Sequence, residues 1–217
     1  MQTLSEEQKK LLAGATSRYH ASLPGSPAAE YLDSRGLPLT DVGRFRLGYV
    51  AEPVLGHEMY RGRLAIPYLR RSAAGQWTVV SMKFRCVQGG CRCENHPKYL
   101  GLPDIRPRMY NTVALTEEPD EIGISEGEID AITATVAGIP TVGIPGVEAW
   151  RPHFWQPFLG YASVYILADG DGPGRKFAHE LAKQLPNAKI IPMPDGEDVN
   201  SVVRAEGREA LMRRIGK

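Results

Sequence analysis

Residues 164–174 are Val-Tyr-Ile-Leu-Ala-Asp-Gly-Asp-Gly-Pro-Gly, and their pattern is the most informative one for the architecture of the second half of the chain. The apolar run 164–167 predicts a buried strand, and the glycines and proline after it predict a tight turn that opens a helix. Asp169 and Asp171 lie on this turn, two residues apart. Because glycine lets the backbone bend sharply, both carboxylates can converge on one hard cation. A plain solvated turn is the alternative.

On both sides of this stretch, short apolar runs alternate with helical patterns. The expected strands are Glu121–Ser125, Thr141–Ile144, Val164–Ala168 and Lys189–Ile191, and the expected helices are Ile129–Ala137, Pro173–Leu185 and Val199–Ala205. This alternation predicts a parallel α/β unit, in which ligands bind at the carboxyl ends of the strands.

Further carboxylates lie where two other expected strands end. Glu126 ends the first strand, and Asp130 lies one helical turn later. Asp198 lies in the acidic loop that opens the last helix. Each has a structural alternative: acids favour the first turn of a helix electrostatically, and Asp198 is a typical N-cap residue.

The first half of the chain has a different pattern. Ser5 and Gln8 form a capping box that predicts a helix from about Glu6 to Leu23, and Ser26-Pro27 opens a short second helix that ends near Gly36. Three β-type runs follow, at Phe45–Val50, Leu64–Leu69 and Trp77–Phe84, and residues 86–111 are irregular and basic. We predict an α+β subdomain over residues 1–115 and an α/β domain over residues 116–217.

Charge divides the chain in the same way. Residues 1–110 carry 16 Lys and Arg against 9 Asp and Glu, whereas residues 111–217 carry 10 against 16. A basic segment joined to an acidic one suggests a polyanion held beside a metal-binding carboxylate cluster.

The order of the acidic motifs resembles the TOPRIM domain shared by DnaG-type primases, topoisomerases and small nucleases. The match runs over about residues 115–215: strand-Glu-Gly-x-x-Asp, then strand-Asp-x-Asp-x-x-Gly, then a Pro-x-Gly-x-Asp loop. The resemblance implies catalytic roles for Glu126, Asp169 and Asp171. It also implies Mg²⁺ or Mn²⁺ on an acidic cluster that comprises Glu126, Asp130, Asp169, Asp171 and Asp198.

The basic half is similar to DnaG-type primases. The matching motifs are Tyr31-Leu32-Asp33-Ser34-Arg35-Gly36-Leu37, Phe45-x-Leu47-Gly48-Tyr49, Arg61-Gly62-Arg63-Leu64-Ala65-Ile66-Pro67, Lys83-Phe84-Arg85, Lys98-Tyr99-Leu100 and Arg108-Met109-Tyr110-Asn111. The resemblance implies a primase core that joins ribonucleoside triphosphates into a short RNA on a single-stranded DNA template. A Lys/Arg groove holds such a template through its phosphates, and Tyr99 or Tyr110 is available for stacking. The expected nucleic-acid contacts are Arg61, Arg63, Lys83, Arg85, Lys98, Tyr99 and Arg108.

The sequence departs from this family at two points. The Asn-Ser-Pro-Glu that commonly follows Lys-Tyr-Leu is here Gly101-Leu102-Pro103-Asp104. In 217 residues we expect neither the zinc ribbon nor the helicase-binding domain of cellular primases. Such a trimmed form suggests a phage or mobile-element protein whose partners are a replicative helicase or a separate zinc-binding chain.

All three cysteines lie together, as Cys86, Cys91 and Cys93, with His96 close by. Three cysteines and a histidine form a zinc ligand set, although the Cys-x-Cys step is tighter than usual. A structural zinc knuckle, reduced free thiols and a disulfide therefore remain as interpretations.

Two other functions remain open. A TOPRIM nuclease uses a similar acid cluster but does not need the primase-like basic half, and a non-catalytic replisome DNA-binding subunit would keep the fold without the chemistry. Neither a membrane span nor a signal peptide is recognisable, so we expect a cytoplasmic protein, in the host cytoplasm if it is phage-encoded.

Overall fold

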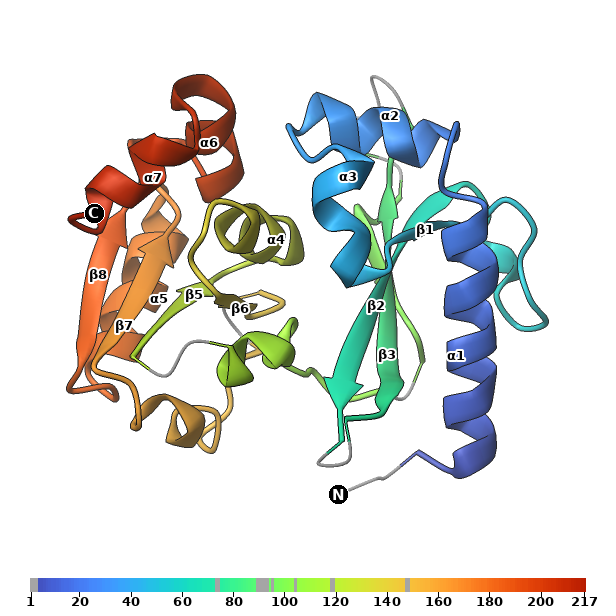
Figure 1. Ribbon diagram of the computed structural model, residues 1–217, viewed down its shortest axis with the longest axis horizontal. Helices are drawn as coiled ribbons and strands as arrows, with labels where there is room; N and C mark the ends of the chain where they lie inside the picture. The colour runs from blue at the N-terminus through green and yellow to red at the C-terminus, as the bar shows by residue number, and fades with distance from the viewer. Residues whose placement is uncertain are drawn as a thin grey trace. The chain divides into compact units, whose positions relative to one another are not determined.

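The computed structural model describes residues 4–72, 75–88, 94, 96–103, 105–117, 120–146 and 149–217. The chain folds into two compact units, Met1–Arg106 and Pro107–Lys217 (Figure 1). The division lies nine residues before the expected boundary near residue 115. The reason is packing: Met109 and Ala114 belong to the hydrophobic core of the second unit, and Tyr110 forms a β-bridge with Gly143.

The first unit begins with two helices that the sequence predicted. Helix α1 spans Glu6–Ala21 and α2 spans Pro27–Ser34. The Ser5–Gln8 capping box is confirmed, and the Ser26 hydroxyl accepts a hydrogen bond from the backbone N–H of Ala29. Each helix start is therefore explained by local chemistry.

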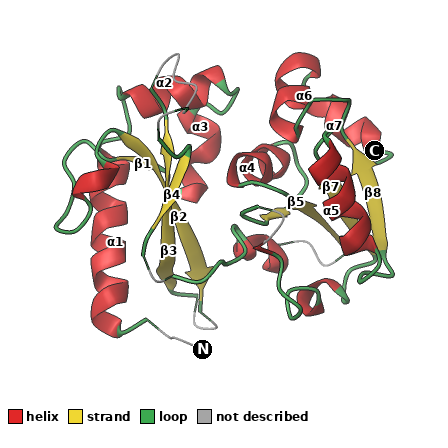
Figure 2. Cartoon of the chain, turned by 180° about the vertical axis from the view of Figure 1, so that it is seen from behind, coloured by secondary structure: helices red, strands yellow, loops and turns green. Residues whose placement is uncertain are grey.

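An antiparallel sheet with strand order β1-β2-β3-β4 forms the centre of this unit (Figure 2). Its strands are β1 (Gly48–Tyr49), β2 (Arg63–Arg71), β3 (Trp77–Cys86) and β4 (Tyr99–Gly101). Helix α1 covers one face, where its residues Ala15 and Tyr19 pack with Ala65, Met82 and Phe84. The approach is close, because a methyl group at Gly48 would lie 2.6 Å from the Tyr19 backbone carbon.

Two expectations for this unit were wrong. The expected strand Phe45–Val50 contains only the short β1, because Phe45 ends a 3₁₀ turn (Gly43–Phe45) that follows α3 (Leu39–Val42) and Arg46 takes a left-handed φ of 53°. The segment expected to be irregular contains β4, which pairs with Lys83 to Arg85 of β3. A further 3₁₀ turn, Glu58–Tyr60, precedes β2.

The second unit has the parallel sheet that the sequence predicted, with strand order β6-β5-β7-β8. The strands are β5 (Glu121–Ser125), β6 (Thr141–Gly143), β7 (Ser163–Ala168) and β8 (Ala188–Pro192). The helices are α4 (Glu128–Val136), α5 (Gly172–Ala182), α6 (Val199–Glu206) and α7 (Arg208–Arg214), with 3₁₀ turns at Thr112–Thr116 and Gln156–Phe158. The sequence did not predict α7.

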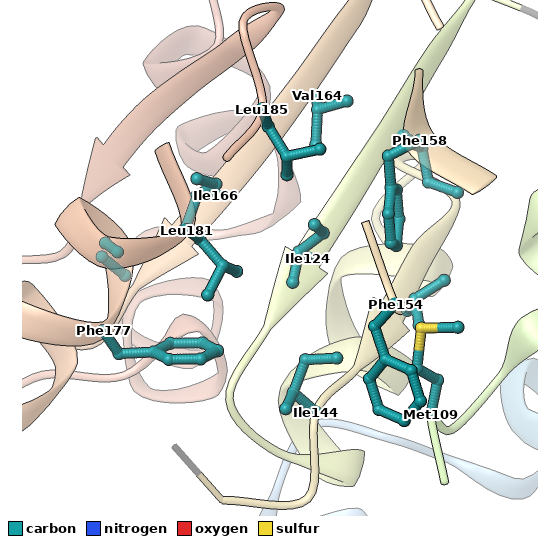
Figure 3. Close-up of a cluster of buried hydrophobic side chains, with 14 of the residues drawn as sticks. Met109, Ile124, Ile144, Phe154, Phe158, Val164, Ile166, Phe177, Leu181 and Leu185 are labelled. Carbon is teal, nitrogen blue, oxygen red and sulfur yellow. The ribbon is translucent and has the colours of Figure 1, made fainter. Parts of the chain in front are cut away.

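Alternate residues of β7 face opposite cores. Val164 and Ile166 pack with Phe177 and Leu181 of α5, as Figure 3 shows. Tyr165 and Leu167 instead pack with residues of α4, α6 and α7. Burial on both sides explains why this strand is an unbroken apolar run in the sequence.

Among the described residues, the structure contains no helix with the length and hydropathy of a membrane span.

Candidate functional site

Strand pairing brings the first acidic residues together. Strands β5 and β7 are parallel neighbours, with Ser125 opposite Leu167. Glu126 and Asp169 follow directly after these strands, so both lie at the carboxyl edge of the sheet. Both side chains are partly buried.

The turn after β7 is clamped against the loop that precedes α6. The backbone N–H of Gly170 donates to Glu197 O at 2.8 Å, and the N–H of Gly196 donates back to Gly170 O at 3.1 Å. A methyl group at Gly170 would lie only 1.7 Å from Pro194 O. This close approach requires glycine and fixes the loop that carries Asp198 next to the turn that carries Asp169.

Asp171 and Asp198 have a capping role. One carboxylate oxygen of Asp171 accepts from the backbone N–H of Gly174 at 2.7 Å, at the start of α5. Asp198 accepts in the same way from Ser201 at 2.6 Å, within a capping box that starts α6. The N-cap alternative for Asp198 is therefore confirmed. Both helix starts hold a carboxylate at the edge of the site.

Asp130 is held by a residue that the sequence argument missed. Asn200 is fully buried; its backbone N–H donates to Asp130 Oδ1 at 3.0 Å, and its side-chain amide donates to Thr133 Oγ1 at 2.8 Å. Asn200 thus joins the start of α6 to Asp130 and Thr133 of α4. The available signal was its position two residues after Asp198, at the start of the helix.

The carboxylates repel one another. Burial, followed by the charges of Asp171 and Asp130, raises the pKa of Glu126 to about 7, although a hydrogen bond from the Asp169 backbone opposes the shift. Burial raises the pKa of Asp169 to about 8, with further contributions from Asp130, Glu126, Asp198 and Asp171. All five acids that the resemblance assigned to the cluster therefore interact electrostatically.

Two buried oxygens in this cluster have no hydrogen-bond partner, Glu126 Oε1 and Asp169 Oδ1. Orphaned carboxylate oxygens in a repulsive cluster suit a hard divalent cation, which supplies the missing positive charge. Within the described part of the chain, no three carboxylate, imidazole or thiolate side chains are already arranged to hold one ion. The five-acid ligand set therefore stays a prediction, and Glu126 and Asp169 have the strongest physical support.

Known proteins share this architecture. Residues 123–203 match the family model described as Toprim-like. The Gene 57 protein of Mycobacterium phage D29 is 56% identical over 157 residues, which cover 72% of this chain and 100% of that protein. The DNA primase of Pseudomonas putida is 28% identical over 249 residues, covering 95% of this chain and 38% of the primase. The chain belongs to the DnaG-type primase family.

Solved structures agree with this membership. A DNA primase domain from Pseudomonas aeruginosa superposes with a TM-score of 0.75 at 25% identity, covering 96% of this chain and 78% of that domain. A DnaG primase catalytic domain bound to single-stranded DNA gives 0.73 at 26% identity, covering 95% and 77%. The chain spans under half the length of the bacterial DNA primases that it matches.

The basic residues that were expected to contact nucleic acid in this DnaG-type chain lie in different environments. Arg61 is exposed and bonds Ala51 O and Glu52, and the Arg63 guanidinium donates to Pro97 O at 3.0 Å. Lys98 is exposed, next to β4. Arg108 lies in the second unit, where its Nε is buried without a hydrogen-bond partner.

Lys83, Arg85 and Tyr99 come together on β3 and β4. The Lys83 ammonium lies 5.4 Å from the centroid of the Tyr99 ring. Arg85 is only 8% exposed; its guanidinium lies 4.9 Å from the Tyr99 ring centroid and 5.1 Å from that of Tyr31, and it donates to the Tyr99 hydroxyl. Arg85 is therefore buried against two aromatic rings, and its expected contact with nucleic acid stays a prediction. Tyr110 is also buried, so the stacking role suggested for it was wrong.

The cysteine cluster is described only in part. The Cys86 sulfur lies 3.9 Å from His96 Nε2, which brings one thiol and one imidazole of the expected set together. Cys91 and Cys93 lie outside the described residues. A zinc knuckle therefore stays a prediction.

Proposed function

We propose that this chain catalyses template-directed RNA synthesis: it joins ribonucleoside triphosphates into a short primer on single-stranded DNA. The observation that carries the proposal is the cluster around Glu126 and Asp169, at the carboxyl edge of a parallel sheet in a DnaG-type core. The likeness to a catalytic domain solved with single-stranded DNA supports this choice of template.

Mg²⁺ or Mn²⁺ would be held by Glu126 and Asp169, with Asp171, Asp130 and Asp198 completing the negative environment. Such an ion lowers the pKa of the attacking 3′-hydroxyl and neutralises charge on the triphosphate. Phosphoryl transfer needs positioning and electrostatic stabilisation above all, and this site supplies both through residues fixed by strand ends and helix caps.

The residues of the chain have separate tasks in this proposal. Glu126, or a water that it holds, is the candidate acceptor for the proton of the 3′-hydroxyl. Asp171 and Asp198 are oriented by the N–H groups that they cap. Asp130 is oriented by the backbone of Asn200.

Template binding is proposed for Arg61, Arg63, Lys83, Lys98 and Arg108, through phosphate contacts that do not depend on base sequence, and for Tyr99, through stacking on a base. Arg85 would act through Tyr99, because it is enclosed by aromatic rings. A replicative helicase or a separate zinc-binding chain would act as partner. The phage relative suggests that the reaction takes place in the cytoplasm of a bacterial host.

The decisive experiment is incorporation of labelled ribonucleotides on single-stranded DNA with Mg²⁺. Asp169→Asn should reduce synthesis at least about 100-fold, a loss typical of removing a key electrostatic group, while DNA binding is retained. Asp195→Asn is the matched control, because Asp195 is exposed on the neighbouring loop and paired with Arg175 at 2.8 Å. Undiminished synthesis by Asp169→Asn would overturn the assignment.

The same assay separates the two other functions. A TOPRIM nuclease would shorten the labelled DNA and incorporate no ribonucleotide. A non-catalytic replisome subunit would bind the DNA and do neither, also when a zinc-binding chain or helicase is added. Metal analysis of protein purified without chelator tests the zinc knuckle, which requires about one zinc per chain.

A further inference from the structure

The hairpin that joins β2 and β3 has a feature that the acidic site does not explain. Arg71 and Trp77, the last residue of β2 and the first of β3, are register partners. The hairpin is closed by hydrogen bonds from Ser72 N to Gln76 O at 2.8 Å and from Gly75 N to Ser72 O at 2.9 Å. The two side chains are therefore presented from a hydrogen-bonded frame.

Trp77 is unusually exposed for its size. Its exposed fraction is 56%, although an indole of this kind is normally much more buried. The Arg71 guanidinium lies 5.9 Å from the ring centroid, at the outer limit of a cation–π contact. Such a loose contact leaves ring surface accessible, and it leaves the guanidinium able to turn toward another partner.

The sequence of the hairpin that carries this pair favours an anionic ligand. Between residues 61 and 93 the sequence has seven Lys and Arg and no Asp or Glu. An exposed aromatic ring beside a guanidinium matches the two parts of a nucleotide, since the ring stacks on a base and the guanidinium pairs with a phosphate. A protein partner of acidic character would satisfy the charge but not require the open indole face.

We propose that Arg71 and Trp77 form an additional contact for single-stranded nucleic acid, in which one base stacks on Trp77 and a neighbouring phosphate binds Arg71. The contact lies outside the residues assigned to the template above. It rests on the proposed function in one respect, that the chain binds single-stranded DNA.

The test measures binding of fluorescein-labelled oligo(dT) to the full chain by anisotropy at several salt concentrations. Trp77→Ala should weaken binding about 10-fold, and Trp77→Phe should retain most of it because phenylalanine still stacks. Arg71→Gln should reduce the dependence of log K on log salt by about 0.7, the value for one phosphate of a single strand.

Two controls match these variants. Met59→Ala removes another exposed apolar side chain, which is 64% exposed. Arg44→Gln removes a guanidinium that lies 5.6 Å from the centroid of Phe45, a ring that is buried and cannot stack on a base. Both controls should bind oligo(dT) like the parent chain.

A second measurement locates the contact. In a Trp150→Phe/Trp155→Phe background, Trp77 is the remaining tryptophan, and stacking should quench its fluorescence when oligo(dT) is added. The inference is overturned if Trp77→Ala binds like the parent or if this fluorescence does not change while the DNA binds. If the parent chain itself does not bind oligo(dT), the proposed template function fails as well, so the two failures are distinguishable.

Discussion

The two units surround their buried titratable groups in opposite ways. In the first unit, the buried Arg85 guanidinium is enclosed by Tyr31 and Tyr99, and the His57 ring is hydrogen-bonded to the Tyr19 hydroxyl at 2.9 Å. In the second unit, Glu126 and Asp169 are crowded by other carboxylates, whose charges help to raise the pKa of both groups.

This difference distinguishes buried charged groups that hold the fold together from buried charged groups that are suited to bind a ligand. A buried charge beside groups that attract it stabilises one arrangement of the chain, whereas a buried carboxylate crowded by like charges costs stability until a ligand binds. The contrast can be sharpened by four measurements.

The largest effect is expected from Gly170→Ala. The new methyl group would lie 1.7 Å from Pro194 O, so the turn after β7 and the loop before α6 must separate. We expect a loss of about 3 kcal/mol in the free energy of unfolding, measured by urea denaturation. Gly160→Ala is the control, because nothing lies within 4 Å of its added methyl group. Equal stability of the two variants would show that the close contact between the turn after β7 and the loop before α6 is not needed for stability.

Gly174→Ala should act on the acidic site itself. Its methyl group would lie 2.6 Å from Glu126 Oε1 and 2.9 Å from Asp169 Cβ. Displacing these groups should cost about 2 kcal/mol of stability and weaken Mn²⁺ binding about 10-fold, as measured by calorimetry. Mn²⁺ affinity equal to that of the parent chain would argue against Glu126 and Asp169 as the main ligands.

Without divalent cations, the second unit should lose stability as the pH rises. The pKa values of Glu126 and Asp169 are raised in the folded chain to about 7 and about 8, so the folded state holds protons that the unfolded state releases near pH 4. The stabilisation is complete below pH 4 and is lost up to about pH 8. A melting temperature lower by about 3 °C at pH 8.5 than at pH 6 is expected.

Asp169→Asn and added Mg²⁺ test the origin of this decrease in melting temperature with pH. Both should make the decrease smaller, since the substitution removes a repelling charge and Mg²⁺ neutralises it. If the melting temperature of Asp169→Asn decreased with pH as much as that of the parent chain, other groups would cause the pH dependence.

The smallest effect is expected in the first unit, with the opposite sign. Burial lowers the pKa of His57, while the charge of Glu58 partly opposes the shift. His57 therefore contributes stability above pH 6.5 that is lost as the pH falls through its folded pKa. Hydrogen exchange should show weaker protection of α1 and β3 at pH 5 than at pH 7. A His57→Gln variant that keeps the same pH dependence would contradict this assignment.

Much of the second unit followed from local sequence. Strand β5 has the predicted bounds, and β7 begins one residue before its predicted start, because buried parallel strands are continuous apolar runs bounded by turn residues. Strand β4 and helix α7 were missed. The three residues of β4 have no distinctive period, and they form a strand because β3 offers an edge for pairing.

From the sequence alone came the starts of the capped helices α1, α2 and α6, the parallel character of the second sheet and the identity of the acidic residues, since caps, apolar runs and motif order are local signals. Only the tertiary structure decided the roles of Arg85 and Asn200. Their partners, Tyr31 and Tyr99 for the first and Asp130 and Thr133 for the second, are distant in sequence. Burial and hydrogen bonding between distant segments depend on how the elements pack, and no local pattern encodes that.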